Sequence, residues 1–256
     1  MTTGKSIPTL LRRSGARAND LGAMSLRELV IAYVTWPSII VYWTLCVASI
    51  AGSVWLGVLD RPWKAVEGLA LGLVIYPTFE YLVHRYVLHS RWLYKNRFTA
   101  DLWKRIHYDH HQDPNRLDVL FGSPANTLPT IVLFGLGIGY AVGGWPVALL
   151  VQALALALYA FYEFCHCVQH LTYMPKAAWL RQIKKNHLAH HFHSEQGNFG
   201  ITSNVIDLLL GSYYGNSDDR PRSVHVYDLG YDEAEKARYP WVAERSGPAR
   251  GQPRAR

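Results

Sequence analysis

The amino-acid sequence predicts an all-α integral membrane protein with four transmembrane helices and a helical cap on the cytoplasmic side. Half of the 256 residues are hydrophobic, and many of them lie in long runs that contain no charged residue. One run extends from Leu29 to Leu59, and a longer one extends from Val119 to Tyr162. A helix needs about 20 apolar residues to cross a bilayer, so the first run holds one span and the longer run holds two.

The four spans follow one another along the chain and are separated by polar or glycine-rich turns. A charged turn at residues 60–64 ends the first span, and the sequence Gly143-Gly144-Trp145-Pro146 divides the longer uncharged run. The expected spans cover about residues 34–58, 65–83, 127–143 and 146–165.

The flanking composition divides the chain into three segments. We expect a mobile basic tail over residues 1–27, a membrane domain over 28–217 and a polar, partly disordered tail over 218–256. The first tail lacks the short apolar core and cleavage site of a signal peptide. Within the membrane domain, the basic and amphipathic residues 176–193 are expected to form a helix on the membrane surface.

The distribution of positive charge orients the spans in the membrane. Five Lys and Arg residues lie in the N-terminal tail and seven lie between Arg85 and Arg116, whereas the turn at residues 143–146 has none. Cytoplasmic loops are enriched in Lys and Arg, so both termini and the central loop are expected in the cytoplasm.

Composition also excludes several classes of protein. The formal net charge is +7, but the basic residues border apolar segments, where they orient a membrane protein and meet anionic lipid. We therefore expect no nucleic-acid partner. The three cysteines are an odd number within apolar segments, which indicates neither a disulfide framework nor a cysteine-ligated zinc site.

Ten of the twelve histidines fall into four clusters near the ends of apolar segments or in the polar stretches between them. The clusters are His84 and His89; His107, His110 and His111; His166 and His170; and His187, His190 and His191. Residues three or four apart lie on one face of a helix, so the members of each of the last three clusters can share a metal. His84 and His89 are five apart, so the helix must unwind there or the two side chains must serve different metals. The charge-derived topology brings all four clusters to the cytoplasmic side.

This number of imidazoles indicates a site for two metal ions. Neutral imidazole is a common ligand of iron, zinc and copper, and ten imidazoles exceed the coordination of one ion. Two ions with about five ligands each leave open positions for oxygen or water. Carboxylates often orient metal-binding imidazoles through their remaining N–H group. The candidates for that role are Glu80, Asp109, Glu163 and Asp207.

The clusters resemble the histidine boxes of the membrane fatty acid hydroxylase family, the larger group that also contains sterol desaturases. They read His-Arg-Tyr-Val-Leu-His at 84–89, His-Tyr-Asp-His-His at 107–111, His-Cys-Val-Gln-His at 166–170 and His-Leu-Ala-His-His at 187–191. Phe79-Glu80-Tyr81 and Asn198-Phe199-Gly200-Ile201-Thr202 are also similar to the family. The resemblance covers about residues 65–215 and is greatest to fatty acid 2-hydroxylases, whose third box has the same three-residue gap.

The resemblance implies a dinuclear iron centre, with all ten clustered histidines as ligands, that uses O2 to hydroxylate an unactivated C–H bond. It also implies an electron supply, and residues 1–27 are too short for the haem domain that some eukaryotic members contain. We therefore expect an external donor of the cytochrome or ferredoxin type. Nitrogen sites bind zinc at least as readily as iron(II), so zinc is the expected contaminant of purified protein.

The resemblance favours fatty acyl 2-hydroxylation of a membrane lipid, and two alternatives stay open. The same site could desaturate a lipid or sterol, or hydroxylate an aminolipid head group. A protein of another class, a membrane metal transporter or metal-storage protein, would also concentrate histidines. The Ala-, Arg- and Gly-rich tails favour a bacterial inner membrane, with the endoplasmic reticulum as the eukaryotic alternative.

Overall fold

The computed structural model describes residues 20–246, and this part of the chain is helical, with an isolated β-bridge between Asp20 and Arg116. The predicted all-α class is therefore confirmed. Residues 1–19, which make up most of the predicted mobile tail, lie outside the described residues. The remainder of that tail forms a short 3₁₀ turn at Leu21–Ala23 and the start of α1 (Leu26–Thr35), which Ser25 caps by accepting from the Glu28 backbone N–H.

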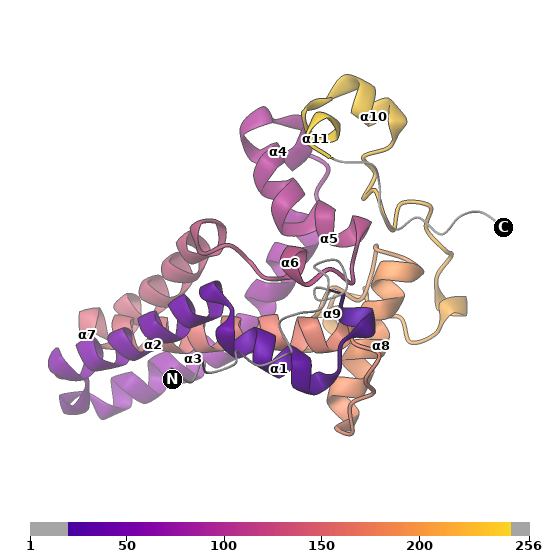
Figure 1. Ribbon diagram of the computed structural model, residues 1–256. Helices are drawn as coiled ribbons and strands as arrows, with labels where there is room; N and C mark the ends of the chain where they lie inside the picture. The colour runs from indigo at the N-terminus through magenta and orange to yellow at the C-terminus, as the bar shows by residue number, and fades with distance from the viewer. Residues whose placement is uncertain (1–19, 247–256) are drawn as a thin grey trace, which may run out of the picture.

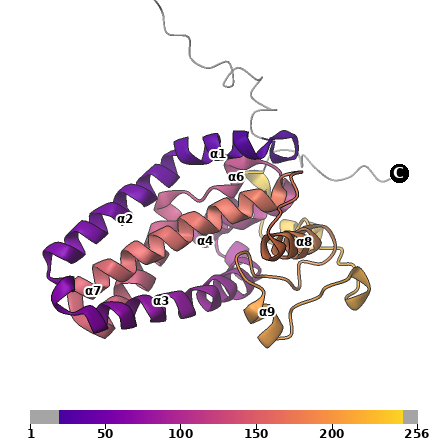
Figure 2. The same cartoon turned by 90° about the horizontal axis from the view of Figure 1, so that it is seen from below.

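Three long helices form the body of the molecule and lie alongside one another (Figures 1 and 2). They are α2 (Pro37–Trp55), α3 (Pro62–Leu82) and α7 (Pro124–His170). A 3₁₀ turn at Val58–Asp60 joins α2 to α3. Within residues 20–246, three helical segments are long and apolar enough to cross a membrane: Pro37–Trp55, Pro62–Leu88 and Leu117–His170.

Helix α7 is interrupted at Gly143 and Gly144, whose backbone angles are not helical. Gly144 has a φ of 70°, a left-handed conformation that glycine adopts without steric cost. The two halves of α7 then pack closely against each other, because a Cβ atom at Gly139 would overlap the backbone at Val147 and Ala148. The predicted break at residues 143–146 is therefore present, and it turns α7 back on itself.

Large apolar side chains cover much of the outer surface of this body. Val47 and Val74 are 64% and 73% exposed on α2 and α3, and Leu133 is 78% exposed on α7. Contiguous apolar surface of this extent is characteristic of contact with a membrane rather than with water. The inward faces pack into a core that includes Tyr42 and Leu156.

The helices between α3 and α7 and those after α7 form a cap at one end of the long helices (Figure 1). Between α3 and α7 the cap contains two π-helical segments, Val83–Leu88 and Lys104–Tyr108, a 3₁₀ turn at Leu93–Lys95, and helices α4 (Arg97–Trp103), α5 (Asp109–Gln112) and α6 (Leu117–Leu120). After α7 it contains α8 (Ala178–Phe192), α9 (Val205–Leu209), a 3₁₀ turn at Ser217–Asp219, α10 (Glu233–Arg238) and α11 (Trp241–Glu244).

The C-terminal segment is folded against the cap as far as residue 246. Leu229, Tyr231 and Val242 pack against Tyr94 and Trp103 in a second hydrophobic cluster. Burial of these large side chains fixes α11 on α4, and α10 in turn contacts α11. The end of the predicted polar tail, residues 247–256, lies outside the described residues.

Candidate metal centre

The ten clustered histidines converge in two groups of five, and within each group the candidate ligand atoms lie within 4.8 Å of one another. The first group is His84, His89, His107, His111 and His190. The second group is His110, His166, His170, His187 and His191. The second and fourth sequence clusters are thus each divided between the two groups.

The first sequence cluster lies on the π-helical segment Val83–Leu88 that continues α3. A π-helix hydrogen-bonds residues five apart, and the His89 N–H donates to the carbonyl of His84 at 3.0 Å. The wider turn brings the two imidazoles to the same side, with 3.2 Å between their Nε2 atoms. The unwinding that the five-residue spacing required is present in this form, and both side chains enter the first group.

The second group is built where α7 ends and α8 passes it. The Nε2 atoms of His170 on α7 and His187 on α8 are 2.8 Å apart. The buried Lys184 ammonium donates to the carbonyls of Val168 and Gln169 at 3.3 and 3.0 Å, and also to that of Leu171. These carbonyls lie at the end of α7, where helices leave acceptors unpaired. Lys184 therefore fixes α8 against the end of α7.

Some of the clustered histidines lie outside the candidate membrane helices, and burial keeps the imidazoles of these residues neutral. Nine of the ten histidines are buried, and His89 is partly exposed. Burial lowers the pKa of His111 to about 3, and it lowers the pKa of His187 and His190 well below their ordinary value, with a further contribution from neighbouring imidazoles. Neutral imidazole is the form that binds a metal ion.

Backbone carbonyls orient three imidazoles of the first group. Nδ1 of His111 donates to the Val226 carbonyl and Nδ1 of His190 donates to the Gly197 carbonyl, each at 2.7 Å. Nδ1 of His84 donates to the carbonyl of Phe199. A carbonyl only accepts, so each Nδ1 has the proton and each Nε2 has a free lone pair.

The unpaired nitrogens of both groups fit a cation. Nε2 of His111 and Nε2 of His190 are buried and have no hydrogen-bond partner among the described residues. Other Nε2 atoms approach one another closely, at 2.8 Å between His89 and His107 and 3.0 Å between His110 and His166. Converging lone pairs without donors are costly unless a positive ion lies among them, and imidazole nitrogen suits iron, zinc or copper.

Two of the four predicted carboxylates hold a loop rather than an imidazole. Both oxygens of Glu80 accept bonds from residues 201 and 202, with the Ile201 N–H at 2.7 Å. Both oxygens of Asp207 accept bonds from Phe199, Gly200 and Ser212 at 2.7–2.9 Å. The loop between them provides the carbonyls that orient His84 and His190.

The other two carboxylates have different partners among the described residues. Asp109 pairs with Lys104 at 2.7 Å, and Glu163 accepts from the Gly122 backbone N–H at 3.0 Å. The structure therefore brings all ten predicted histidines together but places none of the four carboxylates in hydrogen-bond contact with an imidazole. Their influence on metal ligands stays a prediction, and for Glu80 and Asp207 it would act through the loop.

Sequence reasoning did not identify the three orienting carbonyls. A backbone carbonyl leaves no trace in residue type, so nothing marked Val226 or Gly197. The sequence Asn198-Phe199-Gly200-Ile201-Thr202 was the available signal, because it contains one of these carbonyls and most of the residues that Glu80 and Asp207 hold. This segment contains no ionisable side chain, so a similarity to the family at these positions indicates a role for its backbone.

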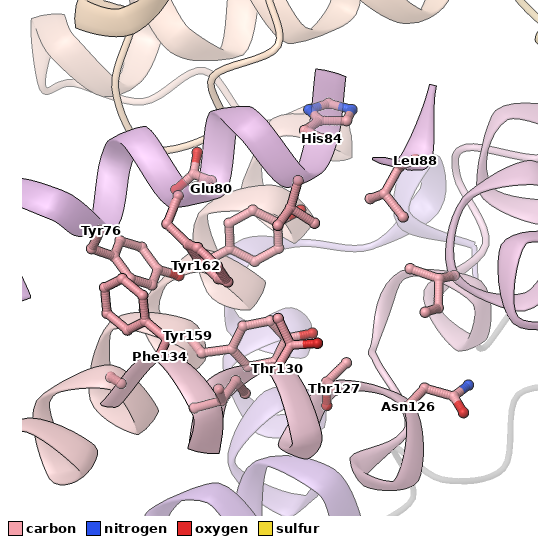
Figure 3. Close-up of a pocket in the computed structure, with 15 residues that line it drawn as sticks. Tyr76, Glu80, His84, Leu88, Asn126, Thr127, Thr130, Phe134, Tyr159 and Tyr162 are labelled. Atoms are coloured by element: carbon pink, nitrogen blue, oxygen red, sulfur yellow. The ribbon is translucent and has the colours of Figure 1, made fainter. Parts of the chain in front are cut away.

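A cavity of about 140 Å³ lies between the long helices and the first group (Figure 3). His84 and Glu80 line one side of it. Its walls are largely aromatic and aliphatic, and a few polar side chains interrupt them. The lining includes Tyr76, Phe79, Val83, Leu88, Ile106, Ile131, Phe134, Tyr159 and Tyr162, with Asn126 and Thr130 as polar members.

Comparison with known proteins places these features in a family. The model of the family "Fatty acid hydroxylase" matches residues 69–212, which is more than half of the chain and includes every histidine of both groups. The dihydroceramide fatty acyl 2-hydroxylase FAH1 of Arabidopsis thaliana is 27% identical over 72% of this chain and 76% of its own length. The ceramide very long chain fatty acid hydroxylase SCS7 of Saccharomyces cerevisiae is 29% identical over 62% of this chain.

The chain is shorter than several of these relatives. It spans 40% of the length of the yeast protein and 37% of that of the fatty acid 2-hydroxylase of Rattus norvegicus, with which it is 26% identical. The solved structure of full-length scs7p, in which only the hydroxylase domain is visible, superposes with a TM-score of 0.58 at 27% identity. That superposition covers 71% of this chain and 69% of the solved one.

Proposed function

Because the chain belongs to the fatty acid hydroxylase family of oxidoreductases, we propose that it hydroxylates a fatty acyl chain of a membrane lipid, at the 2-position. The observation that carries this proposal is the pair of five-histidine groups beside an apolar cavity. Acidic, basic and nucleophilic side chains cannot insert an oxygen atom into an acyl C–H bond, so this oxidation requires a redox centre such as a metal. The relatives named for 2-hydroxylation support the position of attack.

The ten histidines would hold two iron ions, five for each ion. When bound, the iron pair would supply the activation of O2 that C–H hydroxylation needs. The chain itself supplies neutral imidazoles, a buried setting that excludes water, and a fixed orientation for His84, His111 and His190. Zinc is the expected substitute in purified protein, because an all-nitrogen site does not discriminate against it.

The cavity would hold the part of the acyl chain nearest the metals. Its lining combines Phe79, Ile131 and Phe134, which suit a hydrocarbon chain, with Asn126 and Thr130, which suit an oxygen-containing group. Carbon 2 of an acyl chain adjoins the carbonyl carbon, so a 2-hydroxylase must accommodate both kinds of group. The position of His84 in the cavity wall brings this substrate to the first group (Figure 3).

The protein would cross the membrane four times, with α2, α3 and the two halves of α7 as spans of the domain over residues 28–217. The break at Gly143 and Gly144 supports two crossings by α7. The cap and both termini would face the cytoplasm, as the excess of Lys and Arg indicates. We favour a bacterial inner membrane, with the endoplasmic reticulum as the alternative, and an external cytochrome or ferredoxin as the electron donor.

The position of the histidines argues against a metal transporter. A transporter binds its ion near the middle of the membrane on interrupted helices. Here His84 and His166 lie near the ends of the long helices, and the remaining ligand candidates lie in the cap or at the junction with it. The histidine groups therefore lie at the capped end of the long helices, a position that suits an enzyme that takes its substrate from the bilayer.

Lipid mass spectrometry of cells with and without the gene tests the proposed function. We expect acyl chains that gain one oxygen atom at carbon 2 with the intact gene, and none with the His166→Ala variant. The control is His193→Gln, which lies outside both groups and keeps a donor for the Arg220 carbonyl. Loss of two hydrogens would instead indicate a desaturase, and an unchanged lipid profile with altered cell metal content would favour a transporter.

A further inference from the structure

The two histidine groups differ in how the protein orients their rings. In the first group, His84, His111 and His190 each donate an Nδ1–H to a backbone carbonyl. In the second group no ring has such a bond among the described residues. Four Nδ1 atoms of the second group are buried and have no hydrogen-bond partner within residues 20–246: those of His110, His170, His187 and His191.

A hydrogen bond to the far nitrogen of a metal ligand fixes the tautomer and the ring plane, and it makes the ligating nitrogen more basic. Rings that are already oriented lose less conformational freedom when a metal binds. Three rings of the first group have this advantage. The rings of the second group depend on packing and on the metal for their orientation.

Asp207 holds the peptide group that faces His84. Its Oδ2 accepts from the Gly200 N–H at 2.7 Å, and the same peptide unit presents the Phe199 carbonyl to Nδ1 of His84. The N–H and C=O of a trans peptide point in opposite directions within one rigid plane. Fixing the N–H on Asp207 therefore fixes the carbonyl on His84.

The rest of this loop is equally constrained. Asn198 adopts a left-handed backbone conformation with a φ of 55°, and its side-chain amide pairs with the backbone of Tyr214 through two bonds of 3.0 Å. A Cβ atom at Gly197 would overlap the Ser212 carbonyl, and one at Gly200 would overlap the Ser203 carbonyl. The carbonyls that orient His84 and His190 thus belong to a rigid element.

We propose that the two metal sites are unequal, that the first group binds its ion more tightly, and that Asp207 is the positioning residue responsible for part of the difference. This inference rests on the proposed function, because it takes both groups to be metal sites. Asp207 acts through the Phe199–Gly200 peptide and touches no metal ligand itself. Its loss would weaken the first site and leave the second unchanged.

The test is an equilibrium titration of metal-loaded, purified protein with chelators of increasing strength, followed by elemental analysis of the metal retained per chain. Equilibrium matters because His89 is partly exposed, so the first site could exchange faster although it binds more tightly. For the unaltered protein we expect loss in two steps of one ion each. Loss of both ions in a single step would overturn the proposal.

Two ligand variants identify the steps independently of Asp207. His187→Ala disables the second group and should leave one ion at the tighter step, whereas His84→Ala disables the first group and should leave one ion at the weaker step. The reverse assignment would overturn the proposal. A full-length protein that retains no metal would instead refute the proposed function on which the inference rests.

Asp207→Asn tests the positioning role. The amide keeps the size of the side chain but loses one acceptor for the loop, and we expect affinity at the tighter step to fall roughly 10- to 100-fold. Asp218→Asn, at an exposed aspartate, is the matched control and should change neither step. A general loss of folding would weaken metal binding at both steps and broaden the size-exclusion elution profile of the variant. A shift of both steps, or of neither, therefore contradicts the role of Asp207.

Discussion

Two substitutions of Glu80 should distinguish the need for its hydrogen-bond acceptors from the need for its negative charge. In Glu80→Leu, the N–H groups of Ile201 and Thr202 lose their acceptor at a site that is largely closed to water. In Glu80→Gln, the amide oxygen can still accept both bonds. The amide N–H can donate to the Thr202 hydroxyl, which now acts as the acceptor.

The magnitude follows from the number of unpaired groups. A buried donor left without a partner costs about 1–3 kcal/mol, so two of them cost about 2–6 kcal/mol. Folded proteins are stable by about 5–15 kcal/mol, so Glu80→Leu should remove a large share of the total. Glu80→Gln keeps the bonds and should lie close to the unaltered protein.

Thermal unfolding of each purified variant, followed by fluorescence, gives the unfolding midpoints to be compared. Size-exclusion chromatography checks that each variant is folded before heating. We expect a clearly lower unfolding midpoint for the leucine variant and a near-normal midpoint for the glutamine variant. A leucine variant with a midpoint close to that of the unaltered protein would refute the reasoning that these hydrogen bonds hold the loop in place. A glutamine variant as unstable as the leucine variant would show instead that the negative charge itself is required.

Three further predictions concern pH, the loop and the cavity. Burial lowers the pKa of His111 from 6.5 to about 3, so between these pH values the unfolded chain binds a proton that the folded chain does not. The unfolding midpoint of metal-depleted protein should therefore fall as the pH decreases from 6.5 toward 3. A midpoint that rises on acidification would contradict this prediction. Gly200→Ala should lower the unfolding midpoint and the metal content together, because the added Cβ would overlap the Ser203 carbonyl; a variant with normal metal content would show that the loop can shift at no cost to the site. Thr130→Phe should narrow the cavity and shift the hydroxylated acyl chains toward shorter species in lipid mass spectrometry, and an unchanged chain-length distribution would place the acyl chain elsewhere.

The scaffold could be predicted because its signals are strong and local. Long uncharged runs and a Gly-Gly break are properties of contiguous sequence, and the structure has candidate membrane helices and the break where they indicate. The ten histidines could be identified for the same reason. Their residue type and spacing, rather than their contacts, marked them as a set.

The division of the histidines between two groups could not be predicted from the rule that residues three or four apart share one face of a helix. His107 and His110 are three apart, yet they enter different groups, because a π-helical segment ends at Tyr108 and changes the angular spacing. His190 and His191 are adjacent and also point into different groups. Local backbone geometry of this kind depends on the packed cap, which sequence spacing does not encode.

The carboxylates show a second limit of reasoning from residue type. Glu80 and Asp207 were candidates because carboxylates often orient metal-binding imidazoles through their remaining N–H group, but both reach the ligands through the backbone of a loop. A carboxylate that organises peptide groups has the same sequence signature as one that contacts a ring. Only the fold of residues 197–202 distinguishes the two cases.

The carbonyl of Val226 has a consequence for how the protein is made. Every histidine of both groups precedes residue 192, whereas this acceptor for His111 lies 35 residues after the last of them. A nascent chain that ends before residue 226 contains all the candidate ligands but lacks one of the three carbonyls that orient the first group. The first site is therefore complete only after synthesis of the C-terminal segment and its docking on α4, so a ribosome-stalled or proteolysed chain should acquire metal poorly even with every histidine present.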